Sequence, residues 1–244
     1  MTAATQPKDA SKLASRLRTV RARIAAAEQR FDREPGSVRL LAVSKRHPVG
    51  AIAAMHATGQ VDFGENYVDE GLTKMDELDE PTLRWHYIGP IQSNKTRAIA
   101  TRFDWVQSID RAKILRRIGA QRPAELPPIS ALLQVHIGPE ETKSGAAAED
   151  VESLADLALE FPALRLRGLM CIPPPEKAID AQRAWFGQLR SLYATLGGLE
   201  RGWDTLSMGM SGDLEAAIAE GATMVRIGTD LFGPREPAGR NTAP

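Results

Sequence analysis

Hydrophobic and polar positions along the chain follow two alternating patterns. Between positions 9 and 30, apolar residues such as Leu13, Leu17 and Val20 recur every three or four residues, which predicts an amphipathic helix. The next apolar run, 38–45, ends in a polar pair and is followed by Pro48, a pattern typical of a buried strand that leads into a helix. Strand and helix patterns then repeat through the rest of the sequence.

Seven further segments have the pattern of buried strands: 61–64, 84–89, 105–108, 131–137, 166–172, 205–208 and 223–228. Helical patterns lie between the strands: 49–58, 66–78, 95–102, 111–121, 147–161, 176–196 and 212–220. Asp110 and Ser211 have the residue types of N-caps, and Gly197 and Gly221 have the type that ends a helix. Strands that alternate with helices in this way favour a parallel sheet.

Eight strands favour one particular α/β fold, which is a single (β/α)8 TIM barrel, here with an extra N-terminal helix. Such a barrel needs about 250 residues, and the chain has 244. An open doubly wound sheet is the alternative, although the first strand lacks the Gly-x-Gly-x-x-Gly turn that many such sheets carry. We expect one barrel domain over 9–233, a flexible N-terminus over 1–8 and a flexible tail over 234–244.

Composition narrows the classes of partner. The chain has 31 basic and 31 acidic residues, and this balance disfavours nucleic acid or an anionic membrane as the main partner. It has neither a signal peptide nor an apolar run long enough to span a membrane, so we expect a cytoplasmic protein. The single cysteine, Cys171, excludes an intramolecular disulfide and is typical of a buried small residue.

Lys45 ends the first predicted strand, and strand ends form the active sites of such barrels. Alternation places Leu41, Val43 and Lys45 on one face. If that face points into the barrel, partial desolvation would lower the pKa of the Lys45 amine and make it nucleophilic, as a Schiff base requires. The alternative is a solvated lysine at a strand end.

Two loops have the composition of a phosphate site. Phosphate in these barrels commonly binds at the loops after strands seven and eight. Here those loops contain Ser207 and Ser211 with intervening glycines, and Gly228 with Thr229, which offer hydroxyls and backbone amides to an anion. An N-cap and a turn are the alternative for each loop. Arg226 alternates with apolar neighbours and is expected to point inward.

Two further strand ends carry candidate ligand contacts. Asn66 could donate to a ring oxygen or cap its helix. His86 could contact a cofactor or be an interior histidine with a protein partner. The four histidines are scattered without metal-ligand spacing, so no metal site is expected.

Six segments together resemble one protein family. They are Leu41-Ala-Val-Ser-Lys45, Phe63-Gly-Glu-Asn-Tyr-Val68, Trp85-His-Tyr-Ile-Gly89 with Gln92-Ser-Asn-Lys95, Gly168-Leu-Met170, Leu206-Ser-Met-Gly-Met-Ser211 and Met224-Val-Arg-Ile-Gly-Thr229. This set resembles the pyridoxal phosphate homeostasis proteins, the YggS or PROSC family. The resemblance implies a fold type III barrel, similar to the N-terminal domain of alanine racemase, that carries pyridoxal 5'-phosphate (PLP).

By the same resemblance, PLP would form a Schiff base with Lys45. The phosphate would contact Ser207, Ser211, Gly228 and Thr229. Arg226 would face the pyridine nitrogen, and Asn66 and His86 would be additional cofactor contacts.

The family resemblance also implies a function in vitamin B6 homeostasis rather than catalysis. We therefore expect a monomer that binds PLP, with PLP-dependent apo-enzymes as candidate recipients. A guanidinium beside the pyridine nitrogen disfavours its protonation and weakens the ring as an electron sink. Racemisation also needs a second base, which in alanine racemase is a tyrosine of an additional domain. The alternatives are a PLP-dependent amino-acid racemase of low activity and an aldolase-like barrel that uses Lys45 without a cofactor.

Overall fold

The computed structural model describes residues 7–138 and 144–233. The predicted tail, 234–244, lies outside the described residues, as do positions 1–6 of the predicted flexible N-terminus. Pro7 and Lys8 already belong to the first helix, α1 (Pro7–Arg30). No helix among the described residues is long and apolar enough to cross a membrane.

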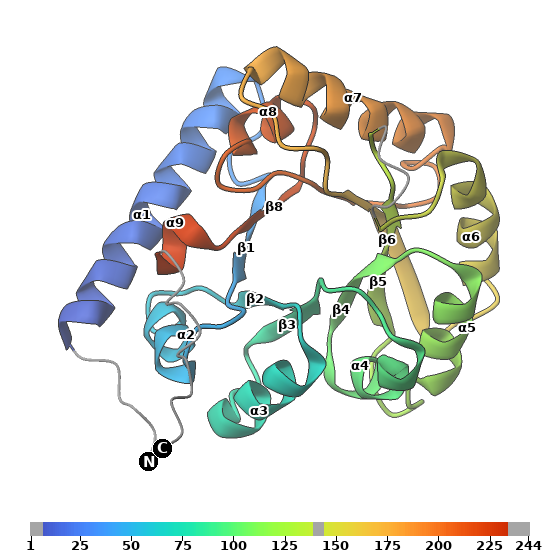
Figure 1. Ribbon diagram of the computed structural model, residues 1–244, viewed down its shortest axis with the longest axis horizontal. Coiled ribbons are helices and arrows are strands. Elements are labelled where there is room, and N and C mark those ends of the chain that lie inside the picture. Colours follow the sequence, from blue (N-terminus) through green and yellow to red (C-terminus); the bar gives the residue numbers. More distant parts are fainter. Residues whose placement is uncertain (1–6, 139–143, 234–244) are drawn as a thin grey trace, which may run out of the picture.

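Eight parallel strands form a closed barrel in chain order, and β1 pairs with β8 to close it (Figure 1). The strands are β1 (Arg39–Val43), β2 (Asp62–Glu65), β3 (Arg84–Tyr87), β4 (Trp105–Ile109), β5 (Ile129–Val135), β6 (Leu164–Cys171), β7 (Thr205–Ser207) and β8 (Met224–Ile227). Each lies at a position where the apolar pattern predicts a strand. The predicted TIM barrel is therefore confirmed.

Helices surround the barrel (Figure 1). After α1 they are α2 (Val49–His56), α3 (Val68–Leu78), α4 (Thr96–Arg102), α5 (Ala112–Gln121), α6 (Val151–Ala158), α7 (Ile179–Thr195), α8 (Leu214–Ala219) and α9 (Thr229–Phe232). Short 3-10 turns, Ser93–Lys95 and Ala148–Asp150, precede α4 and α6. The sequence pattern did not predict α9, which is only four residues long.

The extra N-terminal helix lies along one flank of the barrel, beside α8 and α9 (Figure 1). Its apolar stripe, which includes Leu13, Leu17 and Val20, is buried against the barrel. This burial explains why α1 is stable as an outer helix, because most helical stability comes from packing an amphipathic face.

Several helix starts differ from the predicted ones. The helix predicted over 66–78 begins at Val68, so Asn66 is not its cap, and the cap position is taken by an extended Tyr67. Asp110 is not an N-cap either, because Arg111 is extended and occupies that position, while the Asp110 carboxylate accepts a bond from the Arg111 guanidinium. Ser211 also lies before the cap of α8, which is Asp213. The predicted helix ends at Gly197 and Gly221 are confirmed, since both glycines have positive φ after α7 and α8.

Candidate functional site

A cavity of about 200 Å³ opens at the carboxyl ends of β1 and β8 and beside the loop after β7. Five of the eight predicted site residues line it: Lys45, Ser211, Arg226, Gly228 and Thr229. The structure thus brings one amine, two hydroxyls and one guanidinium to one hollow, although they come from three separate segments of the chain.

Lys45 reaches the cavity because the inward alternation of β1 continues past its last residue. Val43 and Lys45 both line the cavity, whereas Leu40 and Ala42 pack outward in the main core. Lys45 is half-buried. The next residue, Arg46, has a left-handed backbone (φ 62), so the chain turns sharply just after the lysine.

A group of polar and charged side chains holds the backbone of Ser44 and Arg46, the two neighbours of Lys45, and we call it the Lys74 clamp (Ser44, Glu65, Glu70 and Lys74). The Lys74 ammonium donates to the Ser44 carbonyl oxygen (2.8 Å) and to carboxylate oxygens of Glu65 (2.7 Å) and Glu70 (2.6 Å). The Ser44 hydroxyl also donates to Glu65 (2.6 Å), and Glu70 accepts the backbone N–H of Arg46. The clamp therefore fixes the backbone on both sides of Lys45.

Within the clamp, burial has the largest effect on the pKa of the Glu65 carboxyl. It raises this pKa, while the Lys74 ammonium lowers it. The side chain of Glu65 is completely buried and that of Lys74 is 6% exposed. An ion pair so far from solvent is strongly destabilised when one partner is removed.

The loop after β7 depends on one glycine. Gly209 has φ 93, and a Cβ there would lie 2.5 Å from the Cβ of Ala217, so a side chain is excluded by both strain and contact. Asp213 closes the loop by accepting the N–H of Met210. This turn brings Ser211 to the edge of the cavity.

Arg226 is held by three acceptors deep in the barrel. Its Nη1 donates to the carbonyl oxygen (2.6 Å) and hydroxyl (2.9 Å) of Ser207, and its Nη2 donates to the Cys171 carbonyl (2.8 Å). Burial lowers the pKa of Arg226 and raises that of the Cys171 thiol to about 12. Cys171 is therefore a buried structural residue, as its sequence context predicts, and not a reactive thiol.

The remaining three predicted residues do not line the cavity. The Ser207 hydroxyl is fully buried behind Arg226 and donates to Gln107. His86 is an interior histidine, bonded to Asp62 and Gln107 and stacked on Trp105. Asn66 is half-buried, and its backbone carbonyl accepts the Tyr87 hydroxyl (3.2 Å).

Sequence reasoning missed Gln107, Asp62 and the Lys74 clamp. Gln107 and Asp62 are polar residues in short strands that are buried throughout, and this combination is the signal that could have found them. Lys74 lies on a helix whose pattern is amphipathic, and nothing in that pattern distinguishes it from a solvated lysine. Within the described residues, no group of three histidine, cysteine or acidic side chains could hold a metal ion.

Comparison with known proteins identifies the family of the chain. The alanine racemase N-terminal domain model matches residues 15–236. A pyridoxal phosphate homeostasis protein of Pseudomonas aeruginosa is 55% identical over 226 residues, which cover 93% of this chain and 97% of the relative. The chain belongs to the pyridoxal phosphate homeostasis protein family. The Escherichia coli member is 49% identical over 230 residues, covering 92% of this chain and 97% of its own.

Solved structures support the same assignment. PipY of Synechococcus elongatus PCC7942, solved with PLP bound, superposes with a TM-score of 0.79 at 37% identity and covers 91% of this chain and 100% of its own. Alanine racemase of Corynebacterium glutamicum has a TM-score of 0.69 at 14% identity, over 94% of this chain and 63% of the racemase. At that identity the racemase shares the fold alone. The resemblance predicted from the sequence motifs is confirmed.

Proposed function

We propose that this family member binds PLP in the cavity at β1 and β8 and acts in PLP homeostasis as a carrier rather than as a catalyst. The observation that carries the proposal is the meeting of Lys45, Arg226 and the Ser211 and Thr229 hydroxyls around that one cavity. PLP would supply a reactive aldehyde and an electron-withdrawing ring. PipY, which is similar over nearly the whole chain, has been solved with PLP bound.

Lys45 suits the aldehyde. Its primary amine can attack the aldehyde carbon to form a Schiff base, with the carbonyl oxygen leaving as water. Because water reverses this bond, the same lysine can hold and release the cofactor. The Lys74 clamp on the neighbouring backbone restricts where the amine can lie.

Ser211, Gly228 and Thr229 suit the phosphate. They lie along the wall of the cavity that the β7 and β8 loops form. Hydroxyls and glycine-flanked amides bind an anion without a basic surface, which agrees with the zero net charge of the chain.

Arg226 suits an unprotonated pyridine nitrogen. Its guanidinium carries a fixed positive charge, so a proton on a nitrogen beside it would be unfavourable. The ring is then a weak electron sink, which favours storage over turnover. A low-activity racemase is the alternative, and exchange of a substrate α-proton with solvent, faster than with free PLP, would favour it.

Absorbance titration with PLP tests the proposal. We expect the wild-type protein to develop a visible absorbance band that differs from that of free PLP, and we expect Lys45→Ala to lose this band. Lys95→Ala is the matched control, because Lys95 is a partly exposed lysine paired with Asp69 outside the cavity lining. It should keep the band. An undiminished band in Lys45→Ala would contradict the proposal.

A further inference from the structure

A continuous chain of polar side chains crosses the interior of the barrel. Such interiors are normally filled with branched apolar side chains. Here five strands each contribute one buried polar residue, and we call them the interior chain: Asp62, His86, Gln107, Ser207 and Arg226. Burying polar groups is unfavourable unless they are hydrogen-bonded, so their arrangement needs a physical reason.

The links of the interior chain are all within hydrogen-bond distance. His86 Nε2 lies 3.0 Å from an Asp62 carboxylate oxygen, and His86 Nδ1 lies 3.0 Å from Gln107 Nε2. Ser207 Oγ lies 2.7 Å from Gln107 Oε1, and Arg226 Nη1 lies 2.9 Å from Ser207 Oγ. Because β4 and β7 are not neighbours, the bond from Ser207 to Gln107 crosses the lumen of the barrel.

The two charged ends determine the position of every hydrogen in the chain. A carboxylate can only accept, so His86 must carry its proton on Nε2, and in the neutral ring Nδ1 is then an acceptor. Gln107 must therefore present its amide N–H to His86 and its oxygen to Ser207. The Ser207 hydroxyl donates to that oxygen and accepts from the Arg226 guanidinium. All bonds consequently point from Arg226 toward Asp62.

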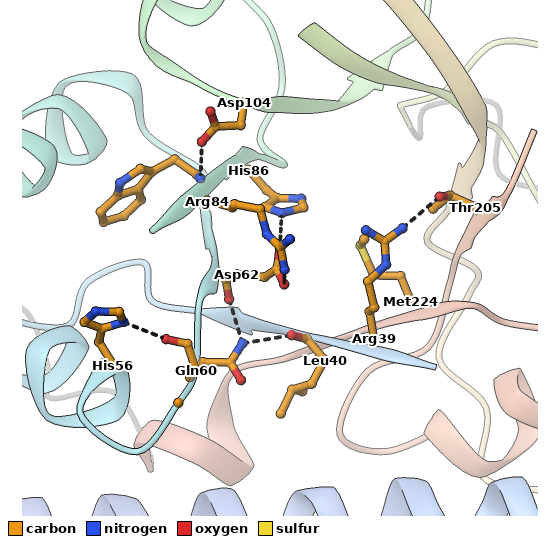
Figure 2. A network of polar contacts seen from close by, with 12 residues as sticks. Arg39, Leu40, His56, Gln60, Asp62, Arg84, His86, Asp104, Thr205 and Met224 are labelled. Carbon is orange, nitrogen blue, oxygen red and sulfur yellow. Dashed lines mark hydrogen bonds and ion pairs between the residues drawn. The ribbon is translucent and has the colours of Figure 1, made fainter. Parts of the chain in front are cut away.

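The ionisation of both ends agrees with this assignment. Burial raises the pKa of Asp62, but hydrogen bonds from His86 and Arg84 outweigh it and lower the pKa to about 2. Figure 2 shows these two donors meeting at the Asp62 carboxylate, with Arg84 bound through two nitrogens at 2.8 and 2.7 Å. Burial lowers the pKa of His86 and keeps the ring neutral. Hydrogen bonds aligned in one direction polarise and strengthen one another.

We infer that Asp62, His86, Gln107 and Ser207 are positioning residues for Arg226. They hold its guanidinium in one orientation at the cavity wall, aimed at the ring nitrogen of bound PLP. The inference rests on the proposed function. It also gives Ser207 a different role from the phosphate contact that the sequence suggests, because its hydroxyl is engaged by Gln107 and Arg226.

Gln107→Met tests the inference, since methionine is close in length but removes both bonds in the middle of the chain. Gln60→Met is the matched control: Gln60 is also buried, but its amide donates to the backbone carbonyls of Leu40 and Asp62, outside the side-chain links (Figure 2). Two readouts are compared: the nitrogen NMR signals of the His86 ring in the cofactor-free protein, and the visible spectrum of the PLP-loaded protein.

We expect Gln107→Met to change the His86 signals, to shift the visible band, and to raise the apparent dissociation constant of PLP by roughly threefold to tenfold, as for one lost hydrogen bond. Gln60→Met should leave the His86 signals and the band in place. Ser207→Ala combined with Gln107→Met should be no weaker than Gln107→Met alone, because both act through one chain. If Gln107→Met does not fold, Asp62→Asn, which keeps an acceptor but removes the charge, is expected to move both readouts in the same direction.

The outcomes separate the two proposals. A wild-type protein that takes up no PLP overturns the proposed function and the positioning inference together. Normal loading of the wild type, with altered His86 signals but an unshifted band and unchanged affinity in Gln107→Met, overturns the positioning inference alone. If Ser207→Ala alone also weakens PLP binding and its loss adds to that of Gln107→Met in the double variant, Ser207 returns to the phosphate site and the inference is contradicted.

Discussion

Lys45 and Arg226 both line the candidate cofactor cavity, but their surroundings give them different roles. Lys45 is half-buried at the end of a strand, where its amine can react. Arg226 is almost completely buried and donates to Ser207 and Cys171. A half-buried amine and a fixed guanidinium that line one cavity suit a site that binds an aldehyde reversibly while it controls the charge of the attached ring.

Ser211→Ala tests the proposed contact between the loop after β7 and the phosphate of PLP. If its hydroxyl donates to the phosphate, loss of this charge-assisted bond, worth about 1.5–3 kcal/mol, should weaken PLP binding roughly tenfold to a hundredfold. Equilibrium dialysis of PLP measures the effect. Ser153→Ala, an exposed serine on α6, is the control and should bind PLP as the wild type does. Equal affinities for the two variants would remove Ser211 from the site.

Asp62 predicts a pH dependence of stability. Its pKa in the folded protein, about 2, lies below the ordinary 3.8, so the folded state binds fewer protons and is stabilised above about pH 4. This contribution, roughly 1–2 kcal/mol after allowance for solvent screening, is lost as pH falls from 4 to 2. Urea unfolding should therefore show a deficit for Asp62→Asn at pH 7 that shrinks toward pH 3. A deficit independent of pH would contradict the assigned pKa.

At the scale of elements, the ends of β1 and β2 and the face of α3 meet in the Lys74 clamp. The clamp joins three segments whose sequence separation hides the contact. It explains how the strand end can present Lys45 into a cavity while the next residue has a left-handed backbone. Lys74 and Glu65 must remain paired, because the side chain of Glu65 is completely buried and that of Lys74 is only 6% exposed.

Lys74→Met should lower the free energy of unfolding by about 3–5 kcal/mol, the effect of leaving Glu65 buried without its partner. Adding Glu65→Gln should recover part of the loss, because the uncompensated charge is then absent. Urea unfolding of both variants and of Glu65→Gln alone measures this. If the double variant is as unstable as the sum of the single ones, the two side chains do not act as a pair.

Strand positions were predictable from the sequence, but several contacts were not. Each apolar run marked a strand because both of its faces are buried, and the chemistry of strand ends pointed to five residues that line one cavity, Lys45, Ser211, Arg226, Gly228 and Thr229. His86 could not be assigned, since its role depends on Asp62 and Gln107, which lie 24 and 21 positions away and meet it only through strand register. Helix starts were less predictable, because tertiary contacts displaced residues with good capping chemistry, such as Asp110.

For the whole molecule, a chain of buried polar side chains runs through the interior of the barrel. The cavity lies at the carboxyl ends of β1 and β8, whereas Asp62 and its partner Arg84 are the first residues of β2 and β3. The interior chain connects them. Five of the predicted site residues therefore lie together at one mouth of the barrel.

A carrier should deliver PLP by contact. We expect a PLP-dependent apo-enzyme, mixed with the loaded protein, to regain activity faster than PLP appears in buffer without the enzyme. The comparison requires only enzyme assays and absorbance over time. Reactivation at the rate of spontaneous release would show that free PLP is the species transferred.

Borohydride reduction tests the central claim most directly, because it converts a Schiff base into a stable amine. After reduction of the PLP-loaded protein and proteolysis, mass spectrometry should find one reduced cofactor on the peptide that contains Lys45. No such mass should appear in Lys45→Ala. A protein that acquires no added mass, or that carries it on another lysine such as Lys95, would contradict the account.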